Sequence, residues 1–283
     1  MTETAKAATN IHSYTLVFSL YGQYVLPREE GVWVGTLIRA LAPLGYSAGA
    51  VRAMVSRMQR KGYLQGRRIG RHSFYRLTER GLKEVRRGGD RAFAASDDVH
   101  EERWTVVTYS VPERQRRQRD LLRDCLKWWG FGALAPGTWI SPRMLRAEEE
   151  AKLRRLGVWE YLEIFRGTHL GPSDAHTLVA HAWPQLEHVA GRYRAYLVRY
   201  EPVLRRCEAG ELDDEGCFAT QLLSLCQFVA ITLEDPALPP PLLPEDWPRP
   251  AAQALFKGLQ HALSEPAACF FEAVCIFPGG THA

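Results

Sequence analysis

Basic side chains gather without acidic ones in one stretch of this chain. Between Gly31 and Thr78 the sequence holds nine Lys or Arg residues and no Asp or Glu, and eight of the nine follow Ser47. Guanidinium and ammonium groups bind phosphates, and neutralising a polyanion releases its condensed counterions. Carboxylates on such a surface would repel phosphates. An acid-free stretch of 48 residues therefore predicts a nucleic-acid partner.

The segment Ser47–Lys61 has the pattern of a helix that reads DNA, with Ser47 as a favourable N-cap. Apolar residues at the i, i+3, i+4, i+7 spacing predict one buried face: Val51, Met54, Val55 and Met58. Small and basic residues share the opposite face and its flanks: Gly49, Arg52, Ala53, Ser56, Arg57 and Arg60. Small residues let a helix approach the floor of a major groove, and arginines beside them reach guanine edges or phosphates. Together with Ser47 they form the predicted DNA-binding face.

Two short strands, Leu64–Ile69 and His72–Leu77, are predicted after this helix. Gly70 at the first position of a two-residue turn suits a tight hairpin. Arginines that would touch phosphates or a minor groove crowd its tip: Arg67, Arg68 and Arg71. Further helices are expected at Ser13–Tyr24, at Val34–Ala42 and from Thr78 toward Arg87. Three helices, a hairpin and a last helix make the winged variant of helix-turn-helix.

Other interpretations of the basic residues stay open. Any one of these arginines could simply keep a helix or a loop in water, whereas the complete acid-free set favours nucleic acid. Two more arginine groups, within 114–119 and 192–206, are better explained as solvated helix faces. Either group could meet the phosphates of a bulky effector, and Arg192 and Arg199 are the weak candidates for that contact.

Composition indicates a basic module attached to a mildly acidic body. Residues 1–90 hold 15 Lys and Arg against 6 Asp and Glu, whereas the remainder holds 21 against 26. The six cysteines form no Cys-x-x-Cys pair, which is typical of reduced thiols in a cytoplasmic protein. The first ten residues lack the apolar core of a signal peptide. The uncharged run Gly216–Leu233 contains polar residues, so a buried helix is favoured over a membrane span.

The pattern along the chain predicts an α+β multidomain protein. A winged-helix domain is expected at 11–88 and a linker at 89–102. Residues 103–170 show the order β-α-β-β-α-β of a small ferredoxin-like domain. Residues 171–283 are predicted to form a helical C-terminal domain, interrupted by the proline-rich segment Asp235–Pro250.

Signals of catalysis are scarce. The sequence contains no Gly-x-Ser-x-Gly and no His-Glu-x-x-His motif, and its histidines lack the spacing of zinc ligands. We therefore expect no enzyme, no metal and no resident cofactor.

At this point the chain resembles the PaaX family, along nearly its whole length. In the first part the resemblance rests on Leu20-Tyr21-Gly22, Trp33-Val34-Gly35-Thr36-Leu37-Ile38, Ser56-Arg57-Met58 and Tyr75-Arg76-Leu77-Thr78. In the middle it rests on Val111-Pro112-Glu113, Gly130-Phe131-Gly132 and Trp139-Ile140-Ser141-Pro142-Arg143. Near the end it rests on Asp235-Pro236 and on Leu242-Leu243-Pro244-Glu245-Asp246-Trp247. The order of these motifs across three domains is specific.

This resemblance implies a winged-helix domain, a Cas2-like middle domain and a helical C-terminal domain. It also implies a homodimer that binds double-stranded operator DNA and represses an operon for aromatic-acid catabolism of the phenylacetate type. An aryl-CoA or acyl-CoA thioester such as phenylacetyl-CoA would release it. The chain departs from the family pattern at Cys226 and Val229, where many relatives carry His and Arg. An effector different from that of the relatives is therefore compatible with the sequence.

Two alternatives accompany this interpretation. One is a DNA-binding or architectural protein that responds to no ligand. The other is a Cas2-like, Mg²⁺-dependent nuclease, which would need an Asp at the end of the first middle-domain strand. Ser110 occupies that place, and without a carboxylate to hold the metal the nuclease is disfavoured.

Overall fold

The computed structural model describes residues 13–26, 31–93 and 103–275. They form two compact units. Unit 1 combines the described residues up to Phe93 with Tyr193–Leu233 and with the described residues from Arg249 onward. Unit 2 combines the described residues of 94–192 with Glu234–Pro248. The helical C-terminal part thus contributes segments to both units.

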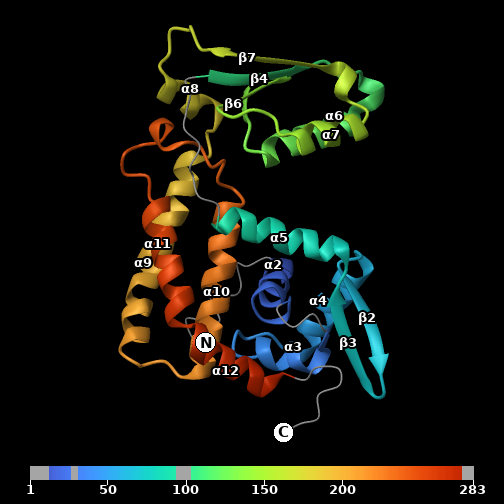
Figure 1. The fold of residues 1–283 in the computed structure, drawn as a ribbon, viewed down its shortest axis with the longest axis vertical. Coiled ribbons are helices and arrows are strands. Elements are labelled where there is room, and N and C mark those ends of the chain that lie inside the picture. Colours follow the sequence, from blue (N-terminus) through green and yellow to red (C-terminus); the bar gives the residue numbers. More distant parts are fainter. Residues whose placement is uncertain (1–12, 27–30, 94–102, 276–283) are drawn as a thin grey trace. The chain divides into compact units, whose positions relative to one another are not determined.

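The N-terminal part of unit 1 consists of helices with a small antiparallel sheet beside them (Figure 1). Its helical elements are α2 (Ser13–Leu20), the π-helical turn η1 (Tyr21–Val25), α3 (Val34–Leu41), α4 (Ala48–Arg60) and α5 (Glu79–Phe93). Its strands are β1 (Val32–Trp33), β2 (Leu64–Ile69) and β3 (His72–Leu77), in the order β1-β3-β2. The two hairpin strands have the predicted bounds, and Gly70 has a φ of 58°, which a tight hairpin turn requires.

One predicted boundary in this part was wrong. The opening helix, predicted at Ser13–Tyr24, is helical as expected, with its last part forming the π-helical turn η1. Helix α5 runs to Phe93, through Gly88 and Gly89, where a linker was expected. A Cβ atom at Gly88 would lie in van der Waals contact with Val229 Cγ1, at 3.4 Å, so this part of α5 lies close to helix α10 (Asp214–Thr232). The remainder of the expected linker, 94–102, lies outside the described residues.

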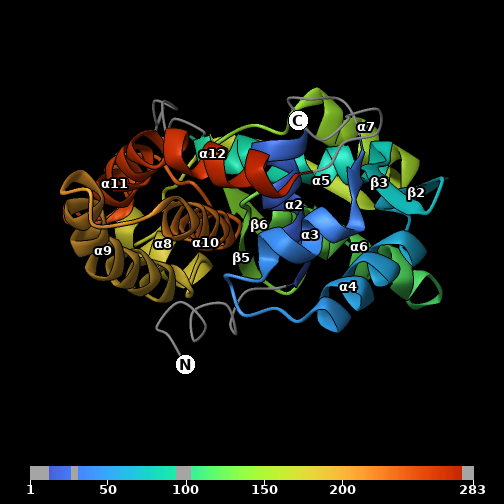
Figure 2. The same cartoon turned by 90° about the horizontal axis from the view of Figure 1, so that it is seen from below.

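Helix α10 is the centre of unit 1. It packs with α9 (Leu186–Glu208), α11 (Arg249–Ala262) and α12 (Ser264–Val274), and α2 lies beside it (Figure 2). The rings of Phe228 and Phe256 stack with centroids 4.4 Å apart. Tyr24 of the N-terminal part donates a hydrogen bond to Gln221 Oε1 and stacks on Phe271. The uncharged run predicted as a buried helix is therefore the core of this unit, and none of the described helices is long and apolar enough to cross a membrane.

Unit 2 is built on a four-stranded antiparallel sheet with the order β5-β6-β4-β7. Along the chain its elements are β4 (Arg103–Tyr109), α6 (Arg116–Trp128), β5 (Gly132–Ala135), β6 (Thr138–Ser141), α7 (Ala147–Arg155) and β7 (Leu162–Thr168). This confirms the predicted β-α-β-β-α-β order. Residues of the strands and of α6 and α7 share one apolar core: Val107, Leu122, Leu126, Trp139 and Leu153.

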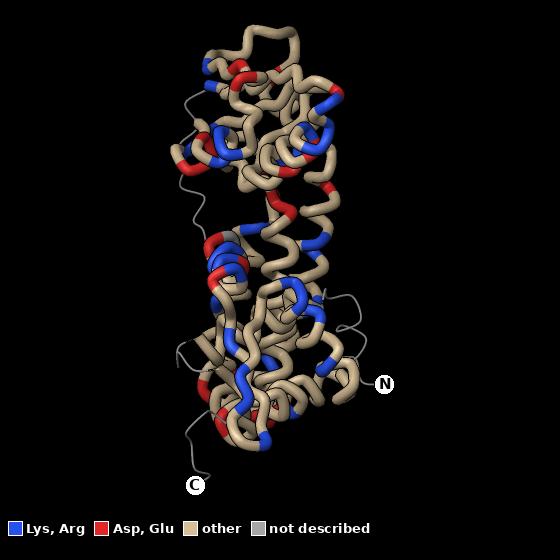
Figure 3. Tube along the Cα trace, turned by 90° about the vertical axis from the view of Figure 1, so that its right-hand side faces the viewer, with Lys and Arg blue, Asp and Glu red and all other residues tan. Residues whose placement is uncertain are grey.

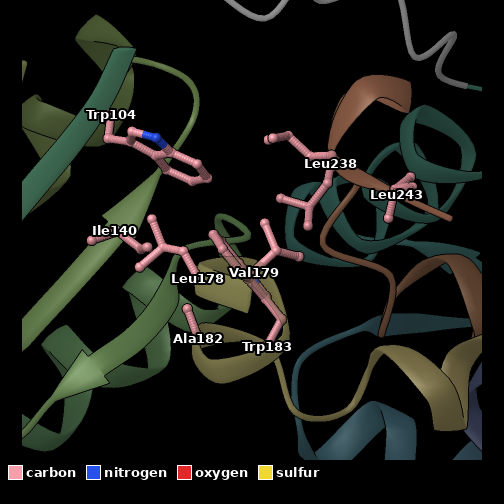
Figure 4. Close-up of a cluster of buried hydrophobic side chains, with 9 residues drawn as sticks. Trp104, Ile140, Leu178, Val179, Ala182, Trp183, Leu238 and Leu243 are labelled. Atoms are coloured by element: carbon pink, nitrogen blue, oxygen red, sulfur yellow. The ribbon is translucent and has the colours of Figure 1, made fainter. Parts of the chain in front are cut away.

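A second apolar core lies on the other face of this sheet (Figure 4). Trp104 and Ile140 of the strands meet Leu178 and Trp183, which lie in or directly after α8 (Ala175–Ala182). The proline-rich segment supplies the remaining wall through Leu238, Leu242 and Leu243. The Trp183 Nε1–H also donates to the Gly130 carbonyl at 3.0 Å. The motif near the end of the sequence that begins with Leu242-Leu243 is therefore part of the apolar packing of unit 2.

Candidate nucleic-acid interface

Helix α4 forms because its start is capped and one of its faces is buried. The Ala50 amide donates to Ser47 Oγ at 3.2 Å, as expected for an N-cap. The predicted apolar stripe is confirmed, since no member of it is more than 2% exposed: Val51, Met54, Val55 and Met58. Burial of this stripe fixes the rotation of the helix about its axis, and thereby decides which residues face outward.

The opposite face of α4 is open to solvent. The structure places there every residue of this helix and its N-cap that was predicted to meet DNA, and all are exposed: Ser47, Gly49, Arg52, Ala53, Ser56, Arg57 and Arg60. The centre of this face carries glycine, alanine and serine, so the helix backbone can be approached closely. The arginines stand around that centre, where they can reach base edges or phosphates.

The hairpin β2–β3 presents a second basic surface. Arg67 and Arg68 lie at the end of β2 and Arg71 lies in the turn, and all three side chains are exposed. The Arg68 Nε–H donates to the Gly70 carbonyl at 3.2 Å, which holds that side chain along the turn. Figure 3 shows Lys and Arg positions following one another along this part of the trace. We call the outer face of α4 and this hairpin tip together the basic face.

Among the residues that the structure describes, the cations of the basic face are not neutralised by carboxylates. Within the described residues, none of its six arginines forms an ion pair with a carboxylate: Arg52, Arg57, Arg60, Arg67, Arg68 and Arg71. The three other cations of the acid-free stretch have structural contacts, and one of them is Lys61, whose ammonium lies 4.8 Å from the centre of the Tyr14 ring. Arg39 stacks on the Trp33 ring at 5.4 Å, and Arg76 donates to Gln65 Oε1 at 3.2 Å. The basic face can therefore bind an anion without first breaking an internal ion pair.

The two candidates for effector contact both lie in α9, which begins in unit 2 and continues into unit 1, and they have different partners. Arg192 forms an ion pair with Glu234, with 2.6 Å between Nη1 and Oε1. Arg199 lies over the Tyr200 ring at 5.7 Å and lines a hollow of about 410 Å³ beside Arg206, Asp213 and Glu215. The acidic residues offset the basic ones there, so this hollow has no excess of positive charge.

Sequence reasoning missed one basic residue beside the interface. Arg80, at the start of α5, donates to the Lys61 carbonyl at 2.8 Å and lies over the Tyr63 ring at 4.6 Å. It joins the end of α4 to α5. Its place after Thr78, outside the acid-free stretch, gave no signal for this contact.

The middle domain has the strand end at which a nuclease would hold its metal, but not the ligands. Ser110 follows β4 and is exposed. Among residues 13–26, 31–93 and 103–275 there is no group of three or more His, Cys, Asp or Glu side chains that could hold a metal ion.

Comparison with known proteins matches each part of the chain to a family model. Residues 12–81 match a model described as "PaaX-like protein", residues 97–179 the "PaaX protein central Cas2-like domain", and residues 183–273 the "PaaX-like protein C-terminal domain". These matches define an α+β protein with a Cas2-like central domain and a helical C-terminal part. The chain belongs to the PaaX family, as its motifs indicated.

A named relative and a solved structure agree with this assignment. The chain is 29% identical over 271 residues to "Transcriptional repressor PaaX" of Escherichia coli K12, which covers 93% of this chain and 84% of that protein. In fold it is similar to "Uncharacterized protein Rv0674 from Mycobacterium tuberculosis", with a TM-score of 0.59, 21% identity and coverage of 90% of this chain and 96% of that one. The named relative is a transcriptional repressor, and the family is one of repressors and not of enzymes.

Proposed function

We propose that this protein is a DNA-binding transcriptional repressor and that α4 with the hairpin β2–β3 acts as a winged helix-turn-helix. The observation that carries the proposal is the basic face, which combines six unneutralised arginines with a helix surface of small residues. In this role α4 enters a major groove and the hairpin tip contacts phosphates or the neighbouring minor groove. The place of action is the cytoplasm, where the DNA lies.

The two elements of the basic face have different tasks in this proposal. Arg52 and Arg57 flank the small residues of α4 and are the side chains that read base edges. Arg67, Arg68 and Arg71 hold the backbone and set the register of the protein on the duplex, without reading sequence. Ser56 at the centre of the helix face donates to a base or to a phosphate.

We therefore expect Arg57→Ala and Arg68→Ala to change DNA affinity in different ways. Loss of a base-reading arginine should weaken operator binding by roughly 1–3 kcal/mol while leaving random DNA little changed. Loss of Arg68 should weaken binding to both DNAs and make the affinity less dependent on salt. Fluorescence anisotropy on operator and scrambled duplexes measures both. Equal losses from the two substitutions on the two duplexes would contradict base readout by α4.

The repressor is proposed to act as a homodimer that pairs through strand β7. This strand is at the edge of the unit 2 sheet and pairs on one side with β4. An edge strand offers free amide and carbonyl groups to a second chain. It also exposes apolar side chains, with Phe165 59% and Ile164 36% accessible. Antiparallel pairing of two β7 strands would make a two-fold symmetric contact, as most homodimers have.

Phe165→Glu should dissociate this dimer, because two carboxylates would then lie in the shared edge. Light scattering during gel filtration should show a monomer at concentrations where the wild type is dimeric. Val198→Glu is the matched control, since Val198 is 76% exposed on α9 of unit 1. A Phe165→Glu protein that remains dimeric would exclude β7 as the interface.

Release from DNA is proposed to follow binding of an aryl-CoA or acyl-CoA thioester, in an operon for aromatic-acid catabolism. The support is the resemblance of the chain to its family. A useful repressor requires a coupling of about 1–3 kcal/mol between effector and operator binding. The effector would supply it by binding more tightly to a form of the dimer that does not fit the operator.

The function is tested by anisotropy on DNA from upstream of the protein's own gene, at fixed salt, with and without a panel of thioesters that includes phenylacetyl-CoA. Tight binding that one thioester releases supports the complete proposal. Tight binding that none releases supports a DNA-binding protein without such an effector. Binding no tighter than to random DNA contradicts a sequence-specific repressor.

A further inference from the structure

Unit 1 has a partly open cavity of about 370 Å³ between α2, α5 and α10, which we call the α2–α5–α10 cavity. Its volume lies in the range of small-molecule sites, which is about 300–1,000 Å³. Three segments that are far apart in the sequence form its walls. The apolar and aromatic members of the lining are Tyr14, Phe18, Tyr63, Val85, Leu225 and Val229.

Three glycines lie where the walls of the cavity come together. Gly22, Gly88 and Gly89 all line it. A Cβ atom added at Gly89 would meet no heavy atom within 4 Å, so the space beside this residue is empty. Gly22 belongs to the π-helical turn η1, and turns of this kind occur frequently at functional sites.

The interior of the cavity suits an uncharged group. Glu84 and Arg87 are the charged residues of its lining, and they form an ion pair with 3.2 Å between Oε2 and Nη1. Behind the lining, burial raises the pKa of the Cys226 thiol to about 12, so the thiol is neutral at physiological pH. Its Sγ lies 4.0 Å from the carbonyl oxygen of Thr15, a lining residue. An ionised ligand group would gain no net opposite charge inside.

Cations flank the aromatic wall of the cavity. The ammonium of Lys61 lies 4.8 Å from the centre of the Tyr14 ring, and the guanidinium of Arg80 lies 4.6 Å from that of Tyr63. Both tyrosines line the cavity. Lys61 and Arg80 can bind phosphates outside it. The arrangement thus selects a molecule with an apolar part for the cavity and a phosphate-bearing part for its rim.

We infer that the α2–α5–α10 cavity binds the acyl group of the effector, with the phosphates of its carrier near Lys61 and Arg80. This inference rests on the proposed function for the identity of the ligand as an acyl-CoA thioester. The cavity, its glycines and the flanking cations supply the location, which the sequence left open.

Tyr63 connects the cavity with the basic face. Its amide donates to the Met58 carbonyl in α4 at 2.9 Å, and its carbonyl accepts from the Thr78 amide at 3.0 Å. The Tyr63 ring meets the Phe18 ring edge-on, with centroids 5.3 Å apart. An acyl group that displaces this ring moves the junction between α4, the hairpin and α5. Because α4 and the hairpin must fit DNA together, such a movement lowers operator affinity.

The inference is tested by filling the cavity. Gly89→Phe places a ring in the empty space, and Gly191→Phe is the matched control. Gly191 is an exposed residue in α9 of unit 2, and a Cβ there also meets no heavy atom within 4 Å. Isothermal titration of the DNA-free, full-length proteins with phenylacetyl-CoA should show a Kd raised about 10-fold or more by Gly89→Phe. The control should remain close to wild type.

Further arms separate the parts of the ligand and guard against misfolding. Coenzyme A and phenylacetate should each bind more weakly than the thioester, because each supplies one of the two parts. If a lowered Tm shows that Gly89→Phe is destabilised, the titration is repeated with Val229→Phe, which fills the cavity from α10 instead. A filled variant that binds phenylacetyl-CoA as tightly as the wild type overturns the inference.

Failure of the cavity and failure of the proposed function give different results. Operator binding of the wild type is measured separately by anisotropy. A wild type that binds operator and no thioester overturns the acyl-group assignment and leaves the DNA-binding function standing. A wild type that binds phenylacetyl-CoA but no operator contradicts the proposed function. The comparison of Gly89→Phe with Gly191→Phe then still shows whether the acyl group binds in the cavity.

Discussion

Raising the salt concentration from 50 to 200 mM should weaken DNA binding of the proposed dimer by a factor of about 10³ or more, because its phosphate contacts release condensed counterions. Each protomer offers six exposed arginines in the basic face, and no carboxylate lies in the surrounding stretch of sequence to offset them. Four of the six, those not assigned to base edges, contact phosphates in the proposal, so a plot of log affinity against log salt should have a slope of about −3.6 per protomer, at about −0.9 for each contact. Anisotropy titrations at several salt concentrations on one duplex measure this slope.

A triple substitution shows which cations produce the salt dependence. Changing Arg67, Arg68 and Arg71 to Ala should reduce the magnitude of the slope by roughly 3. The matched control changes three exposed cations of unit 2: Arg123, Lys127 and Arg155. It should leave the slope unchanged. A shallow slope in the wild type, or an equal loss in both triple variants, would show that the basic face does not bind phosphates.

Local patterns of the sequence predicted the basic face well. The N-cap at Ser47, the apolar stripe of α4 and the bounds of the hairpin were all visible in neighbouring residues, because caps, helical periodicity and two-residue turns are properties of short segments. Exposure of the arginines followed from the burial of the stripe.

Contacts between distant segments were not predictable in the same way. Helix α5 continues through Gly88 and Gly89, whose local signal is that of a linker, because this part of α5 packs close to α10 some 140 residues later in the chain. The α2–α5–α10 cavity likewise needs three such segments. The motif Leu242-Leu243 was noticed for its resemblance, yet its packing in the core of unit 2 became visible only in the fold.

The motif Pro142-Arg143 is another case in which resemblance pointed to residues whose role is structural. The Arg143 guanidinium is held by both carboxylate oxygens of Glu149, at 2.7 and 2.9 Å. It also donates to the carbonyls of Trp129 and Met144, at 2.6 and 2.8 Å. Oε2 of Glu149, one of these two oxygens, also accepts a hydrogen bond from the Arg146 amide at 2.9 Å and so caps α7. One side chain thereby ties α6, the loop after β6 and α7 together.

Glu149→Ala is therefore expected to destabilise unit 2 by about 3–5 kcal/mol, since it leaves a largely buried guanidinium without its carboxylate. The Glu149 side chain is 5% exposed and that of Arg143 is 21% exposed. Urea unfolding followed by tryptophan fluorescence is the suitable measurement. Seven of the eight tryptophans lie in unit 2: Trp104, Trp128, Trp129, Trp139, Trp159, Trp183 and Trp247.

The neighbouring residue supplies the control. Glu150 pairs with Arg154 at 2.6 Å, with side chains 42% and 54% exposed, so Glu150→Ala should cost only about 0.2–0.5 kcal/mol. Similar small losses of unfolding free energy in both variants would mean that the buried ion pair stabilises unit 2 no more than the exposed pair does. If unit 2 loosens as expected, the dimer proposed to form through β7 should be lost with it. The basic face in unit 1 would then bind DNA as a monomer, more weakly, and discriminate less between operator and random sequence.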